Sequence, residues 1–435
     1  MAVSGRLVIL LVLGVVPTIL FNNALAALAW VAAMVAVGIT DLCVAGSPRS
    51  VALTRSLPAQ VRLGETVASE LTIRNTGRRR IRGIVRDGWQ PSAGASPTRA
   101  RIEIPAGERR TITTRLTPFR RGDRRAEHVT IRSFGPLGMV ARQATIAETS
   151  YLRVLPPFNS RKHLPSRIAR LRELDGATSV QMRGPGTEFD SLRDYVRGDD
   201  IRSIDWRATA RRADAAGATL TVRTWRPERD RRVVIVIDSG RTSAARIADE
   251  PRIDTAFEST LLLAALASRA GDRVDSVIYD RRVRGRVQGA TGSDLLAKLV
   301  TSMAPIQPEL IEMDWSAVPS LVRSVTASRA LVVLMTSIDS PGASRSLLSI
   351  LPQLTRKHLV VVASVTDPAV AAATIDRRDR TAVYRAAAAE RALLDTARVS
   401  AALRQLGAEV VTDTPAALPP AVADRYIDLK RSGRL

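Results

Sequence analysis

The chain begins with a long apolar stretch. Residues 7–40 include no charged side chain, Arg6 stands before them and Asp41 after them. A single straight helix over this stretch would be about 51 Å long, whereas the hydrocarbon core of a bilayer is about 30 Å thick. The polar pair Asn22-Asn23 divides the stretch into two apolar segments. The pattern therefore predicts a two-helix membrane hairpin over residues 1–45.

Other interpretations of this stretch stay open. Arg6, an apolar core and the small residues Ala24-Leu25-Ala26 are also typical of a cleaved secretory signal or a single anchor, although the apolar run continues to Ile39. A buried helix of a soluble protein is the remaining alternative. For a hairpin, the positive-inside rule applied to Arg6, Arg49 and Arg55 predicts that both ends lie on the cytoplasmic side.

Between residues 46 and 158 the pattern changes to short runs in which apolar and polar residues alternate. Turn signals such as Asn75-Thr76-Gly77 and Pro105-Ala106-Gly107 separate these runs. Short strands at about ten-residue spacing predict an antiparallel, immunoglobulin-like β-sandwich. The predicted strands cover residues 51–54, 70–74, 81–85, 101–104, 111–116 and 128–132.

Over residues 232–435, apolar strands alternate with helices. Val233 to Ile237 is a continuous apolar run that ends in Asp238, as expected for a parallel strand covered on both faces. Strands are predicted over residues 233–237, 274–279, 282–288, 330–335, 359–365 and 409–412, with helices over 253–270, 293–303, 317–327, 344–354, 381–406 and 420–431. The alternation predicts a doubly wound α/β sheet, in which ligands bind at the C-terminal ends of the strands.

The linker over residues 159–231 interleaves acidic and basic side chains. Three of its apolar residues are spaced as one face of a helix: Phe189, Leu192 and Val196. Asp199 or Asp200 can cap a second helix that follows. We therefore expect a helical docking element with several internal ion pairs.

This linker strongly resembles the signature of the bacterial family called domain of unknown function 58. In that signature a Gly-x-Gly-x-Glu-Phe start is followed by Arg-x-Tyr, Gly-Asp-Asp, Arg and Asp-Trp. The matching residues are Gly184, Gly186, Glu188, Phe189, Arg193, Tyr195, Gly198, Asp199, Asp200, Arg202, Asp205 and Trp206. The resemblance extends to a sandwich that closes with Phe134-Gly135-Pro136-Leu137-Gly138 and to a von Willebrand factor A-like domain over residues 232–435.

The resemblance implies a multidomain protein that is integral to the bacterial cytoplasmic membrane, with its soluble domains on the cytoplasmic side. It also implies a protein partner, a MoxR-type AAA+ ATPase, because relatives typically accompany such ATPases. The family's biochemical role is poorly defined, so the resemblance implies no reaction. Whether the signature serves binding or only folding stays open.

Domains similar to von Willebrand factor A often hold Mg²⁺ at the strand ends, on oxygen ligands. Asp238 and Thr242 fit that pattern, whereas Gly240 has no hydroxyl to offer. Ser337 stands where the family usually has an aspartate, and Asp339 follows two residues later. Two alternatives stay open: a working site of Asp238, Thr242 and Asp339, or a degenerate one in which Asp238 receives a hydrogen bond or an arginine.

The composition excludes several kinds of site and so limits the classes of function that the chain can have. With 65 Lys+Arg against 42 Asp+Glu, the 435-residue chain has a formal net charge of +23, and more than half of this excess lies in residues 1–160. A single cysteine, Cys43, excludes an intramolecular disulfide and a cysteine-based zinc cluster. The chain has no glycine-rich phosphate loop with a lysine and no paired histidines. These observations favour a non-enzymatic protein over an unrecognised hydrolase.

The basic excess has two explanations. Arginine contacts to phosphate would suit nucleic acid, but the basic residues are dispersed and aromatic residues make up only 4% of the chain. We therefore expect no nucleic acid and instead a face toward an anionic membrane surface, formed by Arg78 to Arg80, Arg120-Arg121 and Arg124-Arg125. The sequence favours a membrane-anchored scaffold that binds a protein partner through residues 184–211 and the α/β domain.

Overall fold

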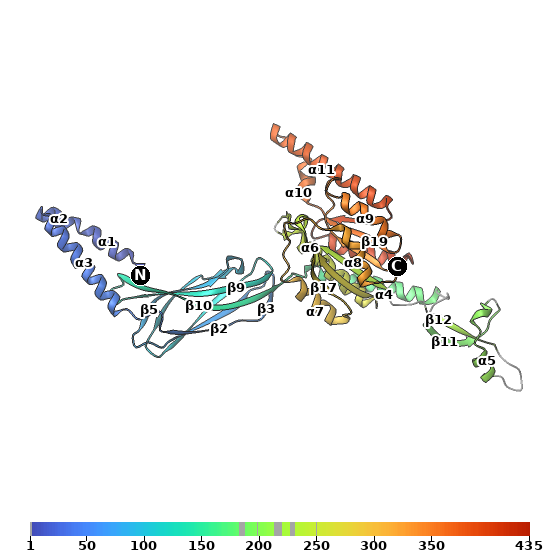
Figure 1. Cartoon of the computed structure of the whole chain (residues 1–435), viewed down its shortest axis with the longest axis horizontal. Coiled ribbons are helices and arrows are strands. Elements are labelled where there is room, and N and C mark those ends of the chain that lie inside the picture. Colours follow the sequence, from blue (N-terminus) through green and yellow to red (C-terminus); the bar gives the residue numbers. More distant parts are fainter. Residues whose placement is uncertain (1, 182–187, 198, 213–219, 227–230, 249) are drawn as a thin grey trace. The chain divides into compact units, whose positions relative to one another are not determined.

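The computed structural model describes residues 2–435 apart from 182–187, 198, 213–219, 227–230 and 249. The side chains of residues 175–181, 188–191, 212 and 224–226 are not described either. The chain divides into two compact units, Met1–Pro157 and Phe158–Leu435 (Figure 1). Each unit has its own sheets and its own apolar core.

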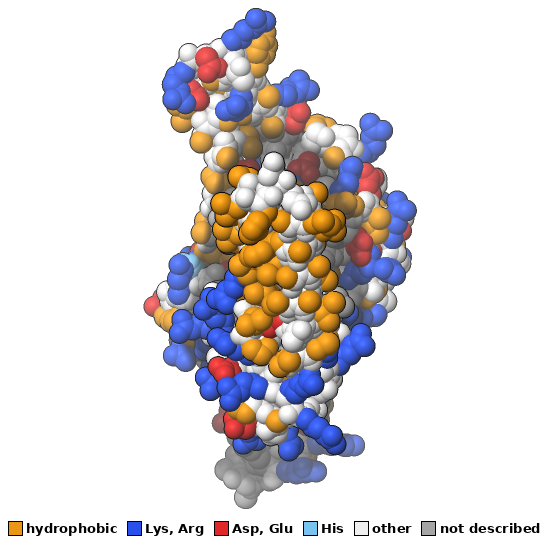
Figure 2. Space-filling view, turned by 90° about the vertical axis from the view of Figure 1, so that its left-hand side faces the viewer, with side chains coloured by type: hydrophobic (Ala, Val, Ile, Leu, Met, Phe, Trp, Pro, Cys, Tyr) orange, Lys and Arg blue, Asp and Glu red, His pale blue; other side chains and the backbone are white. Residues whose placement is uncertain are grey.

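The first unit begins with a short strand, β1 (Ala2–Val3), and apolar helices. These are α1 (Gly5–Leu13), α2 (Val15–Phe21) and α3 (Ala24–Val44), and α1 and α2 pack against α3 (Figure 1). Asn22 turns the chain with a φ of 40°, and the Asn23 side chain caps α3 by accepting a hydrogen bond from Leu25 N at 2.9 Å. Among the described residues, α3 is the one helix long and apolar enough to cross a membrane. Figure 2 shows the apolar surface of these helices facing the viewer.

The helical path of α1 and α2 is interrupted at Gly14. Gly14 N donates to Leu11 O at 3.1 Å, so Leu10 O lacks its usual helical donor. The indole Nε1 of Trp30, on α3, donates to Leu10 O at 2.9 Å and replaces that bond. A Cβ at Gly14 would lie 2.3 Å from Trp30 Cδ1, so only glycine allows this close approach. The contact joins the two helical arms and gives the Leu10 carbonyl a donor at the break.

Two β-sheets follow, with the strand orders β1-β10-β9-β5-β7 and β2-β4-β8-β6, and β3 runs parallel to β10. Side chains from both sheets share one apolar core, in which Leu71 and Ile73 pack with Val85, Val129 and Ile131. The strands are β2 (Val51–Ser56), β3 (Gln60–Arg62), β4 (Val67–Asn75), β5 (Ile81–Trp89), β6 (Ala95–Ser96), β7 (Arg99–Ile104), β8 (Arg109–Leu116), β9 (Gly122–Phe134) and β10 (Val140–Leu155).

Sequence periodicity missed β10, although it is the longest strand described. Its pairing with β9 shifts register between Ala147 and Ser150, which is a β-bulge or a similar irregularity. The side chains of β10 keep the same alternation through this irregularity, but Glu148 and Ser150 occupy two of its inward positions, where Ser150 bonds to Arg55. These polar residues interrupt the apolar side of the alternation on which the prediction relied. Pairing with β9 defines this strand, whereas the alternation in its own sequence is too irregular to predict it.

A buried carboxylate joins α3 to the first sheet. Asp41, which is 2% exposed, accepts hydrogen bonds from the backbone N–H groups of Leu137 (2.8 Å), Met139 (2.8 Å) and Val140 (3.1 Å). These amides belong to the turn between β9 and β10. A Cβ on Gly135 would lie 2.1 Å from Asp41 Oδ1, so the turn needs glycine there. We call this contact the Asp41 clamp.

The last carbonyls of α3 are bonded to the same sheet. Arg142 Nε donates to Leu42 O at 3.0 Å, and the Arg79 guanidinium donates to Cys43 O. Cationic groups at this helix end also interact favourably with the helix dipole. At the other end of the apolar segment, β1 pairs with β10 through Ala2 and Val3. Both ends of the apolar segment are therefore fixed to one end of the sheet.

The predicted basic face is divided between opposite ends of the sheets. Arg78 to Arg80 follow β4 and precede Ile81 of β5, at the end where β9 finishes and the Asp41 clamp lies. Arg120, Arg121, Arg124 and Arg125 lie at the beginning of β9, which is 13 residues or about 43 Å long. Arg121 is also buried, at 2% exposed. The prediction that all seven arginines share one face is therefore wrong.

Arg55 is another arginine whose role differs from the prediction. Its guanidinium forms a 2.6 Å ion pair with Asp87, and both side chains are buried. Asp87 also accepts a hydrogen bond from Trp89 Nε1 at 2.9 Å, and the Arg55 guanidinium lies 5.6 Å from the centroid of that ring. In the folded protein Arg55 holds the sheets together and is not a surface charge.

The second unit is built on a six-stranded sheet with the order β17-β16-β13-β18-β19-β20. β17 is antiparallel to β16, and all other neighbours are parallel. The strands are β13 (Arg232–Asp238), β16 (Arg273–Tyr279), β17 (Val283–Val287), β18 (Leu331–Met335), β19 (Leu359–Val365) and β20 (Glu409–Asp413). Each predicted strand bound lies within one residue of these values. In β13, β18 and β19 the reason is a β-branched run that is buried on both faces.

Helices cover both faces of this sheet (Figure 1). On one face α8, α9 and α11 share a core with Val234, Val332 and Val360. The helices α6 and α12 pack against each other and against strands of the sheet, and α7 packs beside α6. The bounds are α4 (Leu164–Gln181), α6 (Arg252–Arg269), α7 (Gly292–Met303), α8 (Val318–Val325), α9 (Arg345–Thr355), α10 (Pro368–Ala373), α11 (Arg380–Gln405) and α12 (Leu418–Arg431). The strand order reverses between β13 and β18, which is the topological switch point.

Removing the Asp41 carboxylate tests the clamp. Asp41→Ala leaves three backbone amides without their acceptor, and one hydrogen bond to a charged group contributes about 1.5–3 kcal/mol. We expect the free energy of unfolding of the first unit to fall by about 3 kcal/mol or more. Amide exchange at residues 137–140 should accelerate, as measured by hydrogen-exchange mass spectrometry on the detergent-solubilised chain. Arg120→Ala, at the opposite end of β9, serves as control; unchanged exchange in Asp41→Ala would refute the clamp.

Candidate functional site

The C-terminal edge of the second sheet carries the predicted metal ligand Asp238. Asp238 ends β13 and is 2% exposed. Its Oδ1 accepts a hydrogen bond from Gly240 N at 2.7 Å, and its Oδ2 accepts from Thr336 Oγ1 at 2.7 Å and from Thr242 Oγ1 at 3.3 Å. The two predicted residues Asp238 and Thr242 are therefore in contact, joined by Thr336 from the end of β18. Both carboxylate oxygens are occupied by donors from this chain.

Gly240 lies beneath a covering loop. Arg241 N donates to Ile311 O at 2.7 Å, and Glu309 N donates to Ser239 O at 2.8 Å, so the segment after α7 lies over the loop after β13. A Cβ on Gly240 would lie 2.9 Å from Ile311 O and 3.0 Å from Asp238 Oδ1. Backbone therefore fills the space in which a hydroxyl-bearing side chain would stand.

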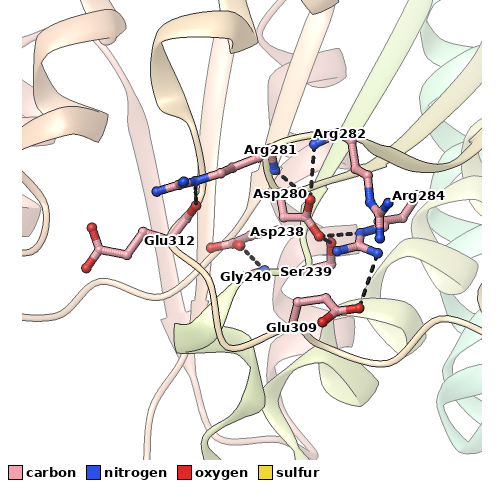
Figure 3. Close-up of polar contacts among 9 residues, drawn as sticks. All are labelled: Asp238, Ser239, Gly240, Asp280, Arg281, Arg282, Arg284, Glu309 and Glu312. Atoms are coloured by element: carbon pink, nitrogen blue, oxygen red, sulfur yellow. Dashed lines mark hydrogen bonds and ion pairs between the residues drawn. The ribbon is translucent and has the colours of Figure 1, made fainter.

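A second carboxylate, Asp280, lies beside this loop and has a different set of partners (Figure 3). Its Oδ1 accepts from Arg281 N at 2.6 Å and Arg282 N at 3.1 Å, and its Oδ2 accepts from Ser239 Oγ at 3.2 Å and from the Arg284 guanidinium. Arg284 also pairs with Glu309 at 3.2 Å. Asp280 thereby connects β16, β17 and the covering loop.

Sequence analysis missed Asp280, although a signal was present. Asp280 follows the apolar run 274–279 just as Asp238 ends the run 233–237. Carboxyl ends of neighbouring parallel strands meet at one sheet edge, so the two aspartates belong together. The strand pattern alone would have indicated the pair.

Asp339, the third predicted metal ligand, has other partners. Its carboxylate pairs with Arg252 NH1 at 3.1 Å and accepts a hydrogen bond from Ser337 Oγ at 2.9 Å. The described contacts do not join Asp339 to Asp238. A cavity of about 20 Å³ lies at this edge, lined in part by Arg252, Ser243 and Thr336, and has room for about one water molecule.

The residues present do not fit a Mg²⁺ site. Mg²⁺ needs near-octahedral oxygen ligands with several retained waters. Here both carboxylate oxygens of Asp238 accept hydrogen bonds from this chain, Gly240 is covered by backbone, and Asp339 pairs with Arg252. Among the described residues there is no group of three or more His, Cys, Asp or Glu side chains that could hold a metal ion. The geometry is that of a hydrogen-bonded junction between loops.

The two aspartates have pKa values shifted in opposite directions. Burial raises the pKa of Asp238, and the hydrogen bonds from Thr336, Gly240 and Thr242 offset this only in part. Burial also acts on Asp280, but the hydrogen bonds from Arg281 N, the Arg284 side chain and Arg282 N together lower the pKa of that carboxyl. The difference arises because Asp280 faces a guanidinium whereas Asp238 faces neutral donors.

The signature residues form a separate small module in the second unit. We use the name signature module for β11 (Glu188–Asp194), the 3₁₀ turn Ile201–Ser203, α5 (Trp206–Arg212) and β12 (Thr221–Arg226). β11 pairs antiparallel with β12, from Glu188 opposite Arg226 to Asp194 opposite Thr221. The predicted helix over Phe189, Leu192 and Val196 is therefore wrong, because pairing with a strand some 30 residues later decided the conformation.

The aspartates of the signature stabilise this module. Asp199 pairs with Arg193 NH2 at 2.6 Å and accepts from Val196 N at 2.9 Å. Asp200 caps the 3₁₀ turn by accepting from Arg202 N at 3.0 Å, and Tyr195 N donates to Leu220 O at 2.7 Å. Of the remaining predicted residues, Gly184, Gly186 and Gly198 lie outside the described residues, and for Glu188 and Phe189 only the backbone in β11 is described.

Asp205 is the central aspartate of the module. Its Oδ1 accepts from Arg207 N and Ala208 N, both at 3.0 Å, which caps α5, and its Oδ2 accepts from Arg223 Nε at 2.7 Å. The N–H of Ala208 and the Arg223 guanidinium hold the pKa of Asp205 below its ordinary value. Arg223, which sequence analysis missed, thus ties β12 to the start of α5.

The outer face of α5 is exposed. Thr209 turns inward, at 5% exposed, and its hydroxyl accepts from Thr221 N at 3.0 Å. Trp206 is 65% exposed, and Arg207, Ala210 and Arg211 are exposed as well. The module therefore uses its carboxylates internally and presents an indole and guanidinium groups to solvent.

The opposite pKa directions of Asp238 and Asp280 give a matched prediction. Asp238 binds its proton more strongly when folded, so its contribution to stability is full at low pH and is lost as the pH rises through its raised folded-state pKa. Asp280 behaves in the opposite way, since its contribution is present at neutral pH and is lost as the pH falls through its lowered pKa. Relative to the unmodified chain, Asp238→Asn should gain stability as the pH rises above about 4, whereas Asp280→Asn should lose stability as the pH rises toward about 4 and keep a constant deficit above it.

Pulse proteolysis in urea, with fragments of the second unit followed by mass spectrometry, measures both variants. The two variants act as controls for each other because they remove the same charge at neighbouring positions. Parallel pH dependences of the two would contradict the assigned environments.

Metal binding can be tested directly. We expect titration of the detergent-solubilised chain with Mg²⁺ or Mn²⁺ to give no binding heat, because the ligand positions are filled by hydrogen-bond donors. Calorimetric heat that disappears in Asp238→Ala would overturn this expectation.

Comparison with known proteins gives relatives without an assigned role. Uncharacterized proteins of Mycobacterium bovis and Mycobacterium tuberculosis are 25% identical to this chain over 187 residues, which cover 42% of this chain. The chain spans about half of the length of these relatives, 56%.

Solved structures that resemble part of the chain include two that each cover about a quarter of it, 24%. A β-glucosidase from Listeria innocua is 21% identical, with 24% of this chain and 16% of that chain covered, at a TM-score of 0.17. A CARDB domain from Pyrococcus furiosus is 16% identical, with 24% and 86% covered, at a TM-score of 0.18. At these TM-scores neither likeness bears on the fold or the function of this chain.

A family model matches residues 191–408, which is just over half of the chain. The matched range begins inside β11 and continues through β19 and α11, so it includes most of the signature module and the edge that carries Asp238. On this match the chain belongs to the family described as Protein of unknown function DUF58.

Proposed function

We propose that this protein is a membrane-anchored, non-enzymatic scaffold that binds a protein partner, a MoxR-type AAA+ ATPase, through the signature module and the α/β domain. The observation that carries the proposal is the exposed face of α5, on which an indole and two arginines lie over a module whose aspartates are bonded internally. Tryptophan and arginine are the residues most enriched at the energetic centres of protein interfaces.

Membrane anchoring is supported by the N-terminal helices. The 21 residues of α3 extend about 31 Å, which is the thickness of a hydrocarbon core. Leu20, Phe21 and Leu25, near the turn between the two arms, are about 70% exposed. The bond from Trp30 to Leu10 O satisfies a carbonyl that would otherwise be bare in lipid. We interpret α1, α2 and α3 as a transmembrane hairpin whose ends lie on the cytoplasmic side of a bacterial membrane.

The two units support a scaffold architecture. We interpret the paired sheets of the first unit as an immunoglobulin-like β-sandwich, because side chains from both sheets form one core. We interpret the second sheet as von Willebrand factor A-like, on its strand order and its single antiparallel edge strand β17. In this interpretation the sandwich connects the membrane to a recognition domain.

A binding role accounts for the described chemistry better than catalysis does. The carboxylates at the switch point are engaged by hydrogen-bond donors or arginines, and the adjoining cavity has room for about one water molecule. The exposed arginines of α5 favour a partner with an acidic surface around an apolar pocket.

Partner binding is tested with variants of the exposed face. Trp206→Ala with Arg207→Ala removes the indole and one guanidinium without touching the bonds of Asp205 or Thr209. We expect at least a ten-fold loss of the co-purifying AAA+ ATPase, since truncation of one central interface residue costs about 2 kcal/mol or more. Quantitative mass spectrometry of the detergent-solubilised full chain and its bound proteins gives the measurement.

Two comparisons make the result interpretable. Tyr384→Ala with Arg385→Ala removes an equally exposed aromatic residue and an arginine from α11, and should leave the ATPase bound. Asp205→Ala removes the cap of α5 and should expose the module to protease. Retention of the ATPase by the Trp206/Arg207 variant would exclude this face, and protease sensitivity of that same variant would show a structural role instead.

A further inference from the structure

The base of the hairpin has a fixed environment of arginines. The Asp41 clamp, the bonds of Arg79 and Arg142 to the last carbonyls of α3, and the pairing of β1 with β10 hold both hairpin ends to one end of the sheets. Side chains at that end therefore keep a constant height relative to the end of α3. We use the name basic collar for Arg6, Arg49, Arg78, Arg79, Arg80 and Arg142.

The collar arginines lie in two groups around the end of α3. Arg6 stands by the turn between β9 and β10, with its NH1 3.5 Å from Leu137 O. The second group adjoins the residues that follow α3, since Thr76 N donates to Ser50 O at 3.0 Å and a Cβ on Gly46 would lie 2.4 Å from Arg80 O. Arginine side chains therefore lie on both sides of the place where the hairpin joins the sheets. Figure 2 shows Lys and Arg side chains beside the apolar helices.

Two collar arginines are available for a ligand. Arg80 pairs with Glu103 at 2.7 Å, and Arg79 and Arg142 are bonded to helix carbonyls. Arg49 and Arg78 are exposed and form no ion pair with the described residues. Glu108, in the turn before β8, is a further acidic residue at this end of the sheets. Arginine therefore dominates the charge around the helix end.

The height of the collar matches the phosphate layer of a bilayer. An α3 of about 31 Å fills the hydrocarbon core, so the residues after Val44 and the turn containing Arg78 reach the headgroup region. Arg120 and Arg125 lie toward the other end of β9, and even Arg125, nine residues from Phe134, is about 30 Å from the collar end, which is several Debye lengths at physiological salt. Position along the sheets therefore separates arginines that face lipid from those that do not.

We propose that the basic collar binds the headgroups of anionic phospholipids, with Arg49 and Arg78 as its phosphate contacts and Arg6 on the opposite side of the hairpin. The proposal rests on the membrane anchoring proposed above. A basic residue near an anionic leaflet contributes enough attraction to change the local preference for charged lipid about five-fold. Because the Asp41 clamp fixes the collar, lipid binding would also orient the sheets against the membrane.

The test uses the full chain in nanodiscs made from equal parts of phosphatidylcholine and phosphatidylglycerol. After transfer into detergent, mass spectrometry gives the ratio of the two lipids that stay with the protein. We expect phosphatidylglycerol to be enriched on the unmodified chain, and Arg49→Gln with Arg78→Gln to reduce the enrichment about 25-fold, five-fold for each arginine. Neither side chain makes a described contact on which folding depends.

The matched control removes the same charge from the far end, as Arg120→Gln with Arg125→Gln, and should keep the enrichment. An equal loss in both double variants, or none in the Arg49/Arg78 variant, would overturn the collar as a lipid site. Incorporation into nanodiscs of phosphatidylcholine alone reports on anchoring separately. A chain that incorporates there but shows no enrichment overturns only the lipid site, whereas a chain that fails to incorporate overturns the anchoring and the lipid site with it.

Discussion

The carboxylate of Asp41 is the constraint on which the first unit depends. It lies in the last turn of an apolar helix, where a charge is costly, and it is kept there by three backbone N–H groups of the turn between β9 and β10. Gly135 is required because any side chain would occupy the position of the carboxylate. The contact bonds the end of the helix directly to the sheet, so it sets the height of α3 relative to the arginines at that end.

The same chemistry recurs at the other aspartates. Asp205 and Asp200 accept from backbone N–H groups at helix starts, Asp199 closes a turn with Arg193, and Asp238 accepts from Gly240 and two threonines. Carboxylates used in this way accept hydrogen bonds from donors of the same chain, whether they are buried as Asp238 is or exposed as Asp200 is. A module rich in aspartates can therefore present exposed arginines and an indole at α5.

Local pattern predicted the elements well where burial is regular. The strands β13, β18 and β19 are buried on both faces, so their β-branched runs leave no other interpretation, and the Asn22-Asn23 turn is determined by the chain itself. Local pattern failed where a distant partner decides. Leu192 and Val196 are spaced for a helix, yet pairing with β12 makes the segment that holds Leu192 a strand. In β10 the polar residues Glu148 and Ser150 occupy inward positions and hide the alternation, because Ser150 bonds to Arg55 of a distant strand.

The sequence by itself determined the apolar N-terminal segment, the order of strands and helices in the second unit, and the excess of arginine. It also indicated Asp238 as a residue at a strand end, since this depends only on the run before it. Tertiary structure decided what each charge does. Arg55 and Arg121 are buried while Arg49 and Arg78 stand at the helix end, and Asp339 faces Arg252 instead of Asp238. These outcomes depend on which distant parts of the chain come within hydrogen-bond distance after folding. A local sequence pattern carries no information about those distances.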